Sequence, residues 1–234
     1  LSFARVSCHG RRLPMKRDIR AVLFDLDGTL VDSAPDLAGA ANEMRRARGL
    51  AEVPYARLRA MVGSGARGLV GEAFGVGPHD ESFIELRDEF LARYESRMTL
   101  QTRIFEQVES LLDALDARAV PWGIVTNKAI RYADPLTRAL GLHERAAVVI
   151  GGDTTPHAKP HPAPLLEAAR RMHIDPACCL YVGDDIRDVQ AGQAAGMCTV
   201  AVTWGYLGVG DPVESWGAHH TVDIAMDVLD LLAS

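Results

Sequence analysis

Residues 23–30 read LFDLDGTL, an apolar run of strand length that ends in two aspartates, Asp25 and Asp27. Two acids directly after a buried strand cost folding free energy unless they serve a ligand or a reaction. In an open α/β sheet, ligands bind outside the carboxyl ends of the strands. The stretch therefore predicts a first strand, residues 21–25, that presents carboxylates to a binding crevice.

Outward from this strand, apolar runs of strand length alternate with longer amphipathic stretches. Further strands are predicted at residues 122–126, 148–150, 180–183 and 199–203, and helices at 106–118, 132–140, 162–172, 189–195 and 224–232. Such alternation is typical of a parallel sheet covered by helices. We predict an α/β fold, a Rossmann-like doubly wound parallel sheet.

The stretch between the first two strands has a different pattern. Residues 33–100 contain no good strand pattern but four helical ones, at 37–48, 55–61, 67–74 and 82–97. So long a helical stretch would make a poor crossover between neighbouring strands. We predict an inserted α-helical cap subdomain at residues 33–100, and a core made of residues 20–32 and 101–234.

The first residues differ in charge from the rest of the chain. Residues 1–20 hold six basic side chains and one acid, Asp18. An acid-poor basic leader can be a targeting peptide. We favour a natural start at Met15, because the residues after it lead straight into the first strand. Residues 1–19 are thus predicted to be an N-terminal extension without a fold.

The composition excludes several classes of protein. The 234 residues carry 25 Lys and Arg against 31 Asp and Glu, a net charge of −6, which disfavours nucleic-acid and anionic-membrane partners. No apolar run reaches the ~18 residues that span a bilayer. The cysteines, Cys8, Cys178, Cys179 and Cys198, form no C-x-x-C pair. Buried free thiols and a cytoplasmic location follow as predictions.

Three later segments bring more polar side chains to the predicted crevice. Carboxylates that gather there repel one another, and a hard cation such as Mg²⁺, which takes oxygen ligands, relieves that repulsion. We therefore predict a Mg²⁺ site beside the first strand. The segments supply Thr126 and Asn127 after one strand, Lys159 before a helix, and Asp184, Asp185 and Asp188 after another strand.

This set of motifs resembles the haloacid dehalogenase superfamily, and within it the phosphatases with a helical cap after the first strand. The four motifs occur in the family's order over residues 21–188, which makes a chance match improbable. The resemblance implies a Mg²⁺-dependent phosphomonoester hydrolase with an aspartyl-phosphate intermediate and a small phosphorylated metabolite as its partner. The matching residues are Asp25-Leu-Asp27-Gly-Thr, Thr126, Lys159-Pro160 and Gly183-Asp184-Asp185 with Asp188.

The same resemblance implies roles for the principal residues. Asp25 would be the nucleophile. Asp27 would act as general acid for the leaving alcohol and then as base for water. Mg²⁺ would be held by Asp25, the Asp27 backbone carbonyl and Asp184. Lys159 would neutralise charge on the nucleophile and on the phosphoryl oxygens.

Supporting roles are implied for the remaining residues. Thr126, with backbone amides near Asn127 and Gly28, would hold the phosphoryl oxygens. Asp188 would lie behind these groups and orient Lys159 or a metal-bound water. Asp185 is ambiguous, because relatives often carry a small polar residue at its position.

Within the family, the segments 61–69 and 125–128 resemble the phosphoglycolate phosphatases, which we place first. Arg67 would then bind a substrate carboxylate, although a solvated helix face explains this arginine almost as well. The segments 126–133 and 205–218 resemble the N-acetylmuramic acid 6-phosphate phosphatases, the main alternative.

Further alternatives concern the reaction and the assembly. A β-phosphoglucomutase-like mutase shares these motifs. A non-catalytic regulator is the weakest interpretation, because neither Asp25 nor Asp27 is missing. The sequence leaves a monomer and a homodimer open.

Overall fold

The computed structural model describes residues 18–208 and 210–232. In these residues the main sheet is parallel, in the order β5-β4-β1-β6-β7-β8. From β1 the chain continues to β4 and β5 on one side of β1 and later to β6 on its other side. Because the strand order reverses at β1, a crevice opens there at the carboxyl ends of the strands. The strands are β1 Ala21–Phe24, β4 Trp122–Val125, β5 Val149–Ile150, β6 Cys179–Gly183, β7 Cys198–Val202 and β8 His220–Val222.

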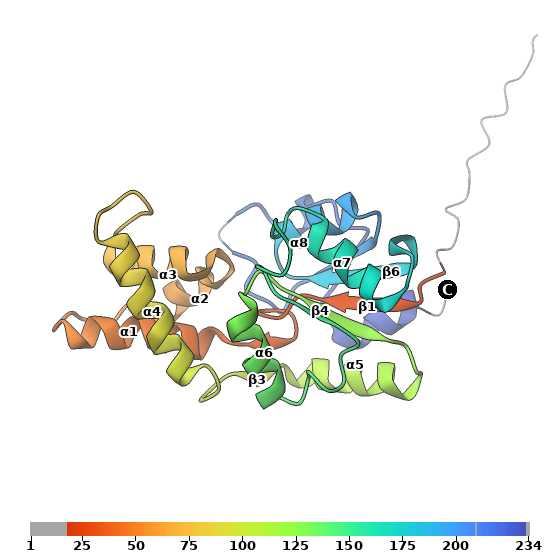
Figure 1. The fold of residues 1–234 in the computed structure, drawn as a ribbon, viewed down its shortest axis with the longest axis horizontal. Helices are drawn as coiled ribbons and strands as arrows, with labels where there is room; N and C mark the ends of the chain where they lie inside the picture. Colours follow the sequence, from red (N-terminus) through yellow and green to blue (C-terminus); the bar gives the residue numbers. More distant parts are fainter. Residues whose placement is uncertain (1–17, 209, 233–234) are drawn as a thin grey trace, which may run out of the picture.

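Helices cover both faces of this sheet. Alternate residues of β1 point to opposite faces: Val22 and Phe24 join the core under α5 and α6, and Ala21 and Leu23 that under α7 and α8. Figure 1 shows α5 on one side of the sheet and α7 and α8 on the other. The doubly wound α/β prediction is confirmed. The helices are α5 Glu106–Ala117, α6 Ile130–Ala139, α7 Ala163–Met172 and α8 Ile186–Ala194.

The cap consists of four α-helices and a 3₁₀ turn. It lies at one end of the long axis of the molecule, with the sheet at the other end (Figure 1). The two chain segments that enter and leave it pair as a short antiparallel ladder, β2 (Val31–Asp32) with β3 (Arg103–Ile104). The elements are α1 Ala34–Ala47, α2 Tyr55–Ala60, η1 Val62–Ser64, α3 Gly65–Phe74 and α4 Phe83–Arg97.

One predicted helix is wrong. Residues 224–232 were expected to form an α-helix with Ile224, Val228, Leu231 and Leu232 on its buried face, but the segment is a 3₁₀-helix, η4, Ala225–Leu231. Its buried residues are Ala225, Val228 and Leu229, whereas Ile224 is 55% exposed. A 3₁₀-helix repeats every three residues, so α-helical spacing places Ile224 wrongly, whereas Val228, Leu231 and Leu232 still pack on the core.

Three short strands were not predicted. β8 at the sheet edge, and the pair β2 and β3, have only two or three residues each, too few to show an alternating pattern. The predicted extension 1–19 lies, up to residue 17, outside the described residues. The domain boundaries at 33 and 100 stay a prediction.

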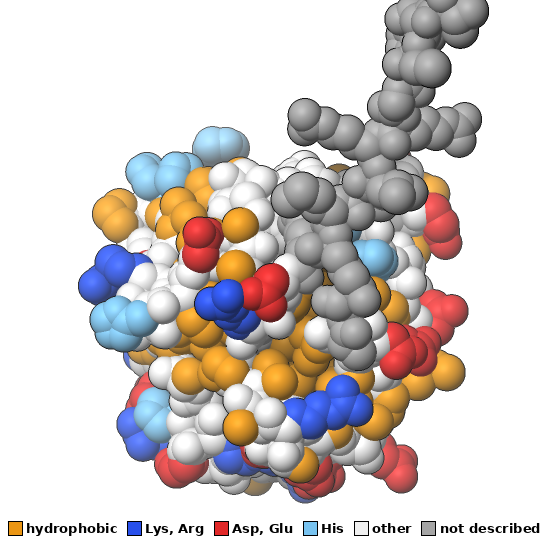
Figure 2. All heavy atoms as spheres, turned by 90° about the vertical axis from the view of Figure 1, so that its right-hand side faces the viewer, with side chains coloured by type: hydrophobic (Ala, Val, Ile, Leu, Met, Phe, Trp, Pro, Cys, Tyr) orange, Lys and Arg blue, Asp and Glu red, His pale blue; other side chains and the backbone are white. Residues whose placement is uncertain are grey.

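On the end of the molecule opposite the cap, the acidic and basic side chains of the described residues are interspersed where this face is visible (Figure 2). No helix in the described part of the chain has the length and apolar character to cross a bilayer.

Candidate active site

A pocket of about 440 Å³ lies where the cap meets the carboxyl ends of the strands. Its walls include Asp25 and Asp27 after β1, Thr126 and Asn127 after β4, and the loop residue Lys159, together with three acids after β6, Asp184, Asp185 and Asp188. The cap contributes residues of η1, α3 and α4. Eight of the ten residues singled out from the sequence for catalysis, binding or metal ligation, all but Gly28 and Arg67, thus line one pocket at the carboxyl edge of the sheet.

Asp25 lies at the centre of this group. Its carboxylate forms an ion pair with Lys159, with 2.8 Å between Oδ1 and Nζ, and the side chain is 13% exposed. Burial, opposed by Lys159, raises the pKa of Asp25 to about 6. A carboxylate that has lost water and is oriented by one buried ammonium fits the role of a nucleophile.

Lys159 is held by several acceptors. Nζ donates to Asp188 Oδ1 at 2.7 Å, to the Tyr181 hydroxyl at 2.8 Å and to the Val125 carbonyl at 3.0 Å, besides its contact with Asp25. Burial lowers the pKa of Lys159, but Asp188 and Asp25 raise it more. Because an ammonium has three protons, its donors are fully used. Asp188 thus lies where a residue that orients Lys159 was expected.

Asn127 fixes the backbone of the same loop. Its side-chain amide donates to the Lys159 carbonyl at 3.0 Å, and its side-chain oxygen accepts from the Lys159 N–H at 2.9 Å. Thr126 is buried and its Oγ1 accepts the N–H of Lys128 at 3.1 Å. The Asn127 side chain therefore positions Lys159, and only the backbone near Asn127 is left for the predicted phosphoryl contact.

Asp184 is buried without a cation. Thr29 Oγ1 donates to one of its oxygens at 2.9 Å and the Tyr206 N–H to the other at 2.8 Å. Burial, Asp25 and Asp188 raise its pKa well above the usual value. Among the described residues, no basic side chain forms an ion pair with Asp184. Here a buried negative charge lacks a counter-charge that the chain itself could provide.

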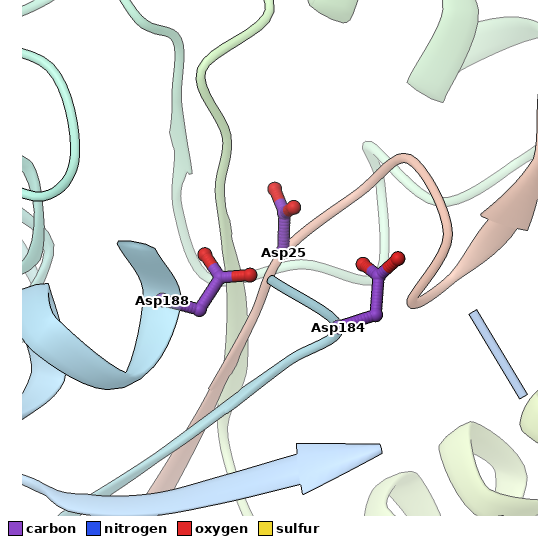
Figure 3. Close-up of side chains that lie close together, drawn as sticks. All are labelled: Asp25, Asp184 and Asp188. Carbon is purple, nitrogen blue, oxygen red and sulfur yellow. The ribbon is translucent and has the colours of Figure 1, made fainter. Parts of the chain in front are cut away.

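The acidic cluster fits a divalent metal ion. Carboxylate oxygens of Asp25, Asp184 and Asp188, one from each, lie within 4.8 Å of one another, and Figure 3 shows the three side chains close together, Asp25 from the segment after β1 and the other two from the segment after β6. A Cβ on Gly28, whose φ is +87°, would come within 2.2 Å of Asp184 Oδ2. Only glycine allows that approach. An oxygen-rich donor set around an uncompensated carboxylate suits a hard cation such as Mg²⁺.

Asp27 points to a different set of partners. Ser33 Oγ donates to its Oδ1 at 2.5 Å, and its Oδ2 lies 3.1 Å from Lys128 Nζ. Lys128 in turn donates to the hydroxyl of Tyr94, on the cap helix α4, at 3.0 Å. The second acid of the motif is therefore tied both to the start of the cap and to its fourth helix.

Asp185 caps helix α8. It accepts the Arg187 N–H at 2.9 Å, and Asp188 accepts the Asp185 N–H in return, which is a capping box. The Arg187 guanidinium binds the Asp185 carboxylate through two nitrogens and also donates to the carbonyl of Gly63 in the cap. Asp185 thus caps α8 and holds Arg187, which contacts the cap.

Arg67 lies apart from the other predicted site residues. It is exposed on α3, while its neighbours Gly63, Ser64, Gly65 and Ala66 line the pocket. This part of the cap therefore lies against the crevice, but the arginine side chain is not among the lining residues. The structure thus gives no support to Arg67 as a substrate ligand.

Several residues of the site were not singled out from the sequence. Thr29 and Tyr206 hold Asp184, and Lys128 and Tyr94 contact Asp27 and each other. Thr29 is the last residue of the first motif, Asp25-Leu-Asp27-Gly-Thr, so its position in the site could have been predicted from the sequence. Tyr94 is far from every motif in the sequence, and Tyr206 lies in the segment 205–218, whose resemblance gave this tyrosine no role.

Comparison with known proteins gives consistent matches. A family model described as haloacid dehalogenase-like hydrolase matches residues 19–196. The N-acetylmuramic acid 6-phosphate phosphatase of Pseudomonas putida KT2440 is 40% identical over 216 residues, 92% of this chain and 97% of that protein. The phosphoglycolate phosphatase of Xanthomonas campestris pv. campestris 8004 is 47% identical over 207 residues, 87% and 92% of the two chains. The crystal structure of a predicted phosphoglycolate phosphatase from Haemophilus somnus 129PT has a TM-score of 0.81 at 28% identity, over 92% and 98% of the chains.

Proposed function

Because the chain belongs to the haloacid dehalogenase-like hydrolases, as its motifs predicted, we propose that it is a Mg²⁺-dependent phosphomonoester phosphatase with an aspartyl-phosphate intermediate. The observation that carries this proposal is the position of Asp25. Its half-buried carboxylate lies at the carboxyl end of β1, paired with Lys159 at 2.8 Å and next to Asp184 in a pocket of substrate size.

The chemistry follows from the side chains. The Asp25 carboxylate attacks phosphorus, and the ester oxygen leaves with a proton from Asp27. Water, deprotonated by Asp27, then hydrolyses the aspartyl-phosphate. The charge of Lys159 and the hydroxyl of Thr126 stabilise the phosphoryl oxygens, and Asp188 keeps Lys159 in place through a contact of 2.7 Å.

Three groups of the chain would hold the metal ion: the carboxylates of Asp25 and Asp184 and the backbone carbonyl of Asp27. When bound, Mg²⁺ supplies positive charge that offsets the carboxylates and the phosphoryl oxygens. The support for this assignment is the buried Asp184 carboxylate, which has no cationic partner among the described side chains.

We propose 2-phosphoglycolate as the substrate. The support is the group of relatives named phosphoglycolate phosphatase, at 45–47% identity over 87% of the chain. N-acetylmuramate 6-phosphate is the second candidate, because relatives of that name are 40–41% identical over 92–93% of the chain. The pocket favours this second candidate in one respect. Its volume of about 440 Å³ is larger than a two-carbon acid fills, and its apolar walls, Phe90, Leu91 and Tyr132, suit a larger substrate.

One set of measurements tests the proposal. The purified protein is assayed with Mg²⁺ on 2-phosphoglycolate, N-acetylmuramate 6-phosphate and β-glucose 1-phosphate, and kcat/KM is compared. We expect release of inorganic phosphate, fastest from the first. Isomerisation of β-glucose 1-phosphate without release of phosphate would identify a mutase. Absence of turnover of every ester, p-nitrophenyl phosphate included, would refute the phosphatase.

Three expectations from the sequence accompany this proposal. Small phosphorylated metabolites are the partners, the protein is a monomer or a homodimer, and it is cytoplasmic. Size-exclusion chromatography with light scattering decides between monomer and dimer. Fractionation of cells decides the location.

A further inference from the structure

The pocket holds three basic side chains, and they differ in how far their donors are used. Lys159 is saturated by the four acceptors described above. Arg187 is bound through two nitrogens by Asp185 and also donates to the Gly63 carbonyl. Lys128, with a side chain 8% exposed, has Asp27 Oδ2 at 3.1 Å and the Tyr94 hydroxyl at 3.0 Å as the only oxygen partners of its ammonium in the described part of the chain, and the ammonium lies 4.6 Å from the centre of the Tyr94 ring.

Two donors at this point lack an acceptor. An ammonium has three protons, so one N–H of Lys128 is left over. The Tyr94 hydroxyl accepts from Lys128, and within residues 18–208 and 210–232 no acceptor for its own proton is found. Tyr94 is 1% exposed, and both residues line the pocket. Buried N–H and O–H groups normally have a hydrogen-bond acceptor. Two neighbouring groups without one, the third N–H of Lys128 and the O–H of Tyr94, indicate that a ligand supplies the acceptor.

The position of the pair shows which part of a substrate it would meet. Phosphorus must lie at Asp25, which Lys128 does not contact in this structure. Lys128 contacts Asp27, the residue that gives its proton to the leaving oxygen. The pair therefore lies on the side of the leaving group, at the junction of the core with cap helix α4.

We infer that Lys128, assisted by Tyr94, binds a carboxylate carried by the leaving group, and that this contact selects the substrate. The inference rests on the proposed phosphatase function and deepens it. The Lys128 ammonium and the Tyr94 hydroxyl can both donate to one carboxylate, and the positive charge of the ammonium then lies opposite the negative charge of that carboxylate. Both candidate substrates satisfy this requirement, 2-phosphoglycolate by its acid group and N-acetylmuramate 6-phosphate by its lactyl group. The assignment replaces Arg67, which lies outside the pocket wall.

The test compares pairs of esters with and without the carboxylate. 2-Phosphoglycolate is paired with its carboxamide, and N-acetylmuramate 6-phosphate with N-acetylglucosamine 6-phosphate, which lacks the lactyl group. For the pair that the wild-type protein uses, kcat/KM should favour the acid by about 10- to 100-fold, the range of a hydrogen bond to a charged group. Lys128→Met should abolish most of that preference, and Lys128→Arg should restore part of it.

Rival positions are tested in the same way. Arg67→Ala should keep the wild-type preference, and Tyr94→Phe should reduce it by about 3- to 10-fold, the effect of one hydrogen bond. If Arg67→Ala or Arg187→Met removes the preference instead, the carboxylate binds elsewhere and the inference is wrong. Equal losses on both members of a pair in Lys128→Met would show that Lys128 only positions Asp27.

Failure of the inference is distinguishable from failure of the proposed function. A wild-type protein that hydrolyses p-nitrophenyl phosphate with Mg²⁺ but treats acid and neutral esters alike overturns the inference and leaves the phosphatase intact. A wild-type protein that hydrolyses no ester overturns both. Thermal melting checks that each variant folds. If Lys128→Met does not fold, the preference for the acid is measured in Lys128→Gln and Tyr94→Phe instead.

Discussion

Lys159 sets the charge balance at the phosphoryl end of the site. It pairs with Asp25 at 2.8 Å and with Asp188 at 2.7 Å, whereas Asp27 pairs with Lys128. The two acids of the first motif therefore have separate cationic partners although they are two residues apart. Separate environments allow two carboxylates to take different roles in one reaction.

This separation makes the two acids distinguishable by substitution. Asp25→Asn removes the nucleophile, so turnover of every ester should fall by at least about 10³-fold. Asp27→Asn keeps the backbone carbonyl and removes only the proton carrier. Its kcat should fall by about 10²- to 10⁴-fold for an alkyl ester and less in the first step for p-nitrophenyl phosphate, whose phenolate leaves unaided.

The measurement is intact mass after mixing with p-nitrophenyl phosphate. Asp27→Asn should accumulate one added phosphoryl group, because hydrolysis of the aspartyl-phosphate lacks its base. Asp25→Asn serves as the matched control and should accumulate none. Phosphorylation of Asp25→Asn would mean that another residue is the nucleophile.

Individual residues of the site differ in how well they could be predicted from the sequence. Asp25, Lys159 and Asp184 each follow or precede a predictable element, and parallel strands bring their ends to one edge. Lys128 and Tyr94 are 34 positions apart and touch only because the cap folds over the strand ends. No periodicity within either segment encodes that contact.

At the scale of elements, the cap is joined to the core through a buried carboxylate at the start of α1. Asp36 Oδ2 accepts the N–H of Gln101 at 2.9 Å and both the N–H and the hydroxyl of Thr102 at 2.8 Å each. It is fully buried, and Arg97 Nε lies 3.6 Å from its other oxygen. One side chain thus joins the segment that enters the cap to the one that leaves it.

Replacement of this carboxylate should destabilise the fold strongly. Asp36→Ala leaves two backbone N–H groups and a hydroxyl without their buried charged acceptor, while Arg97 keeps Glu43 as an ion-pair partner, and we expect a loss of about 3–5 kcal/mol in the free energy of unfolding. Thr102→Val removes one hydroxyl from the same contact and should cost about 1 kcal/mol. Urea unfolding measures both. Similar losses in the two variants would contradict the special role of Asp36.

The loop between η1 and α3 depends on a glycine conformation. Gly65 has φ +62° and ψ −156°, a region that is essentially confined to glycine, and it lines the pocket. Gly49, after α1, also has a positive φ, +67°, but is exposed and is not among the pocket-lining residues. At both positions a Cβ would meet no heavy atom within 4 Å, so only backbone strain distinguishes alanine from glycine there.

These two glycines form a matched pair for substitution. Both Gly65→Ala and Gly49→Ala should lower the free energy of unfolding by about 1–3 kcal/mol through strain. Gly65→Ala alone should lower kcat/KM, because it shifts the loop that forms the pocket wall. An equal effect of both variants on kcat/KM would show that this loop does not shape the site.

Elements also show the limit of sequence patterns. Five of the six strands of the main sheet, β1, β4, β5, β6 and β7, were recognised from apolar runs, since burial on both faces leaves a continuous signal. The prediction for residues 224–232 failed at Ile224, which was expected on the buried face and is exposed, and it left out Leu229, which is buried; Val228 is buried as expected. Packing of η4 against α5, which the local sequence does not encode, decides between the two helix types.

At the scale of the whole molecule, the acidic site acts against folding when no metal is bound. Burial raises the pKa of Asp25 to about 6 and that of Asp184 well above its usual value. A carboxyl group with a raised pKa in the folded state stabilises the fold below its unfolded pKa of about 4, and that contribution is lost as the pH rises through the folded pKa. The metal-free protein should therefore lose stability from about pH 4 to pH 6 and beyond through these two groups.

Asp184→Asn removes one of these charges without removing its hydrogen bonds. The amide oxygen can accept the Tyr206 N–H, and the amide nitrogen can donate to Thr29 Oγ1, which is free to rotate. In EDTA at pH 7.5, the variant should be more stable than the wild-type protein by about 1–3 kcal/mol, and the difference should shrink towards pH 4. Asp227→Asn, at an exposed position, is the control for charge alone.

Addition of Mg²⁺ should reverse the order of stability. At 100 times its dissociation constant, an ion that binds only the folded protein stabilises it by about 2.7 kcal/mol, so the wild-type protein and Asp227→Asn should melt at a higher temperature with Mg²⁺. Asp184→Asn should gain little, because it has lost a ligand with full charge. Thermal melting with EDTA and with Mg²⁺, at pH 4.5 and pH 7.5, measures all of these quantities. The same rise with Mg²⁺ in Asp184→Asn as in the wild-type protein would place the ion away from this cluster, and then the charge of Asp184 would need a different explanation.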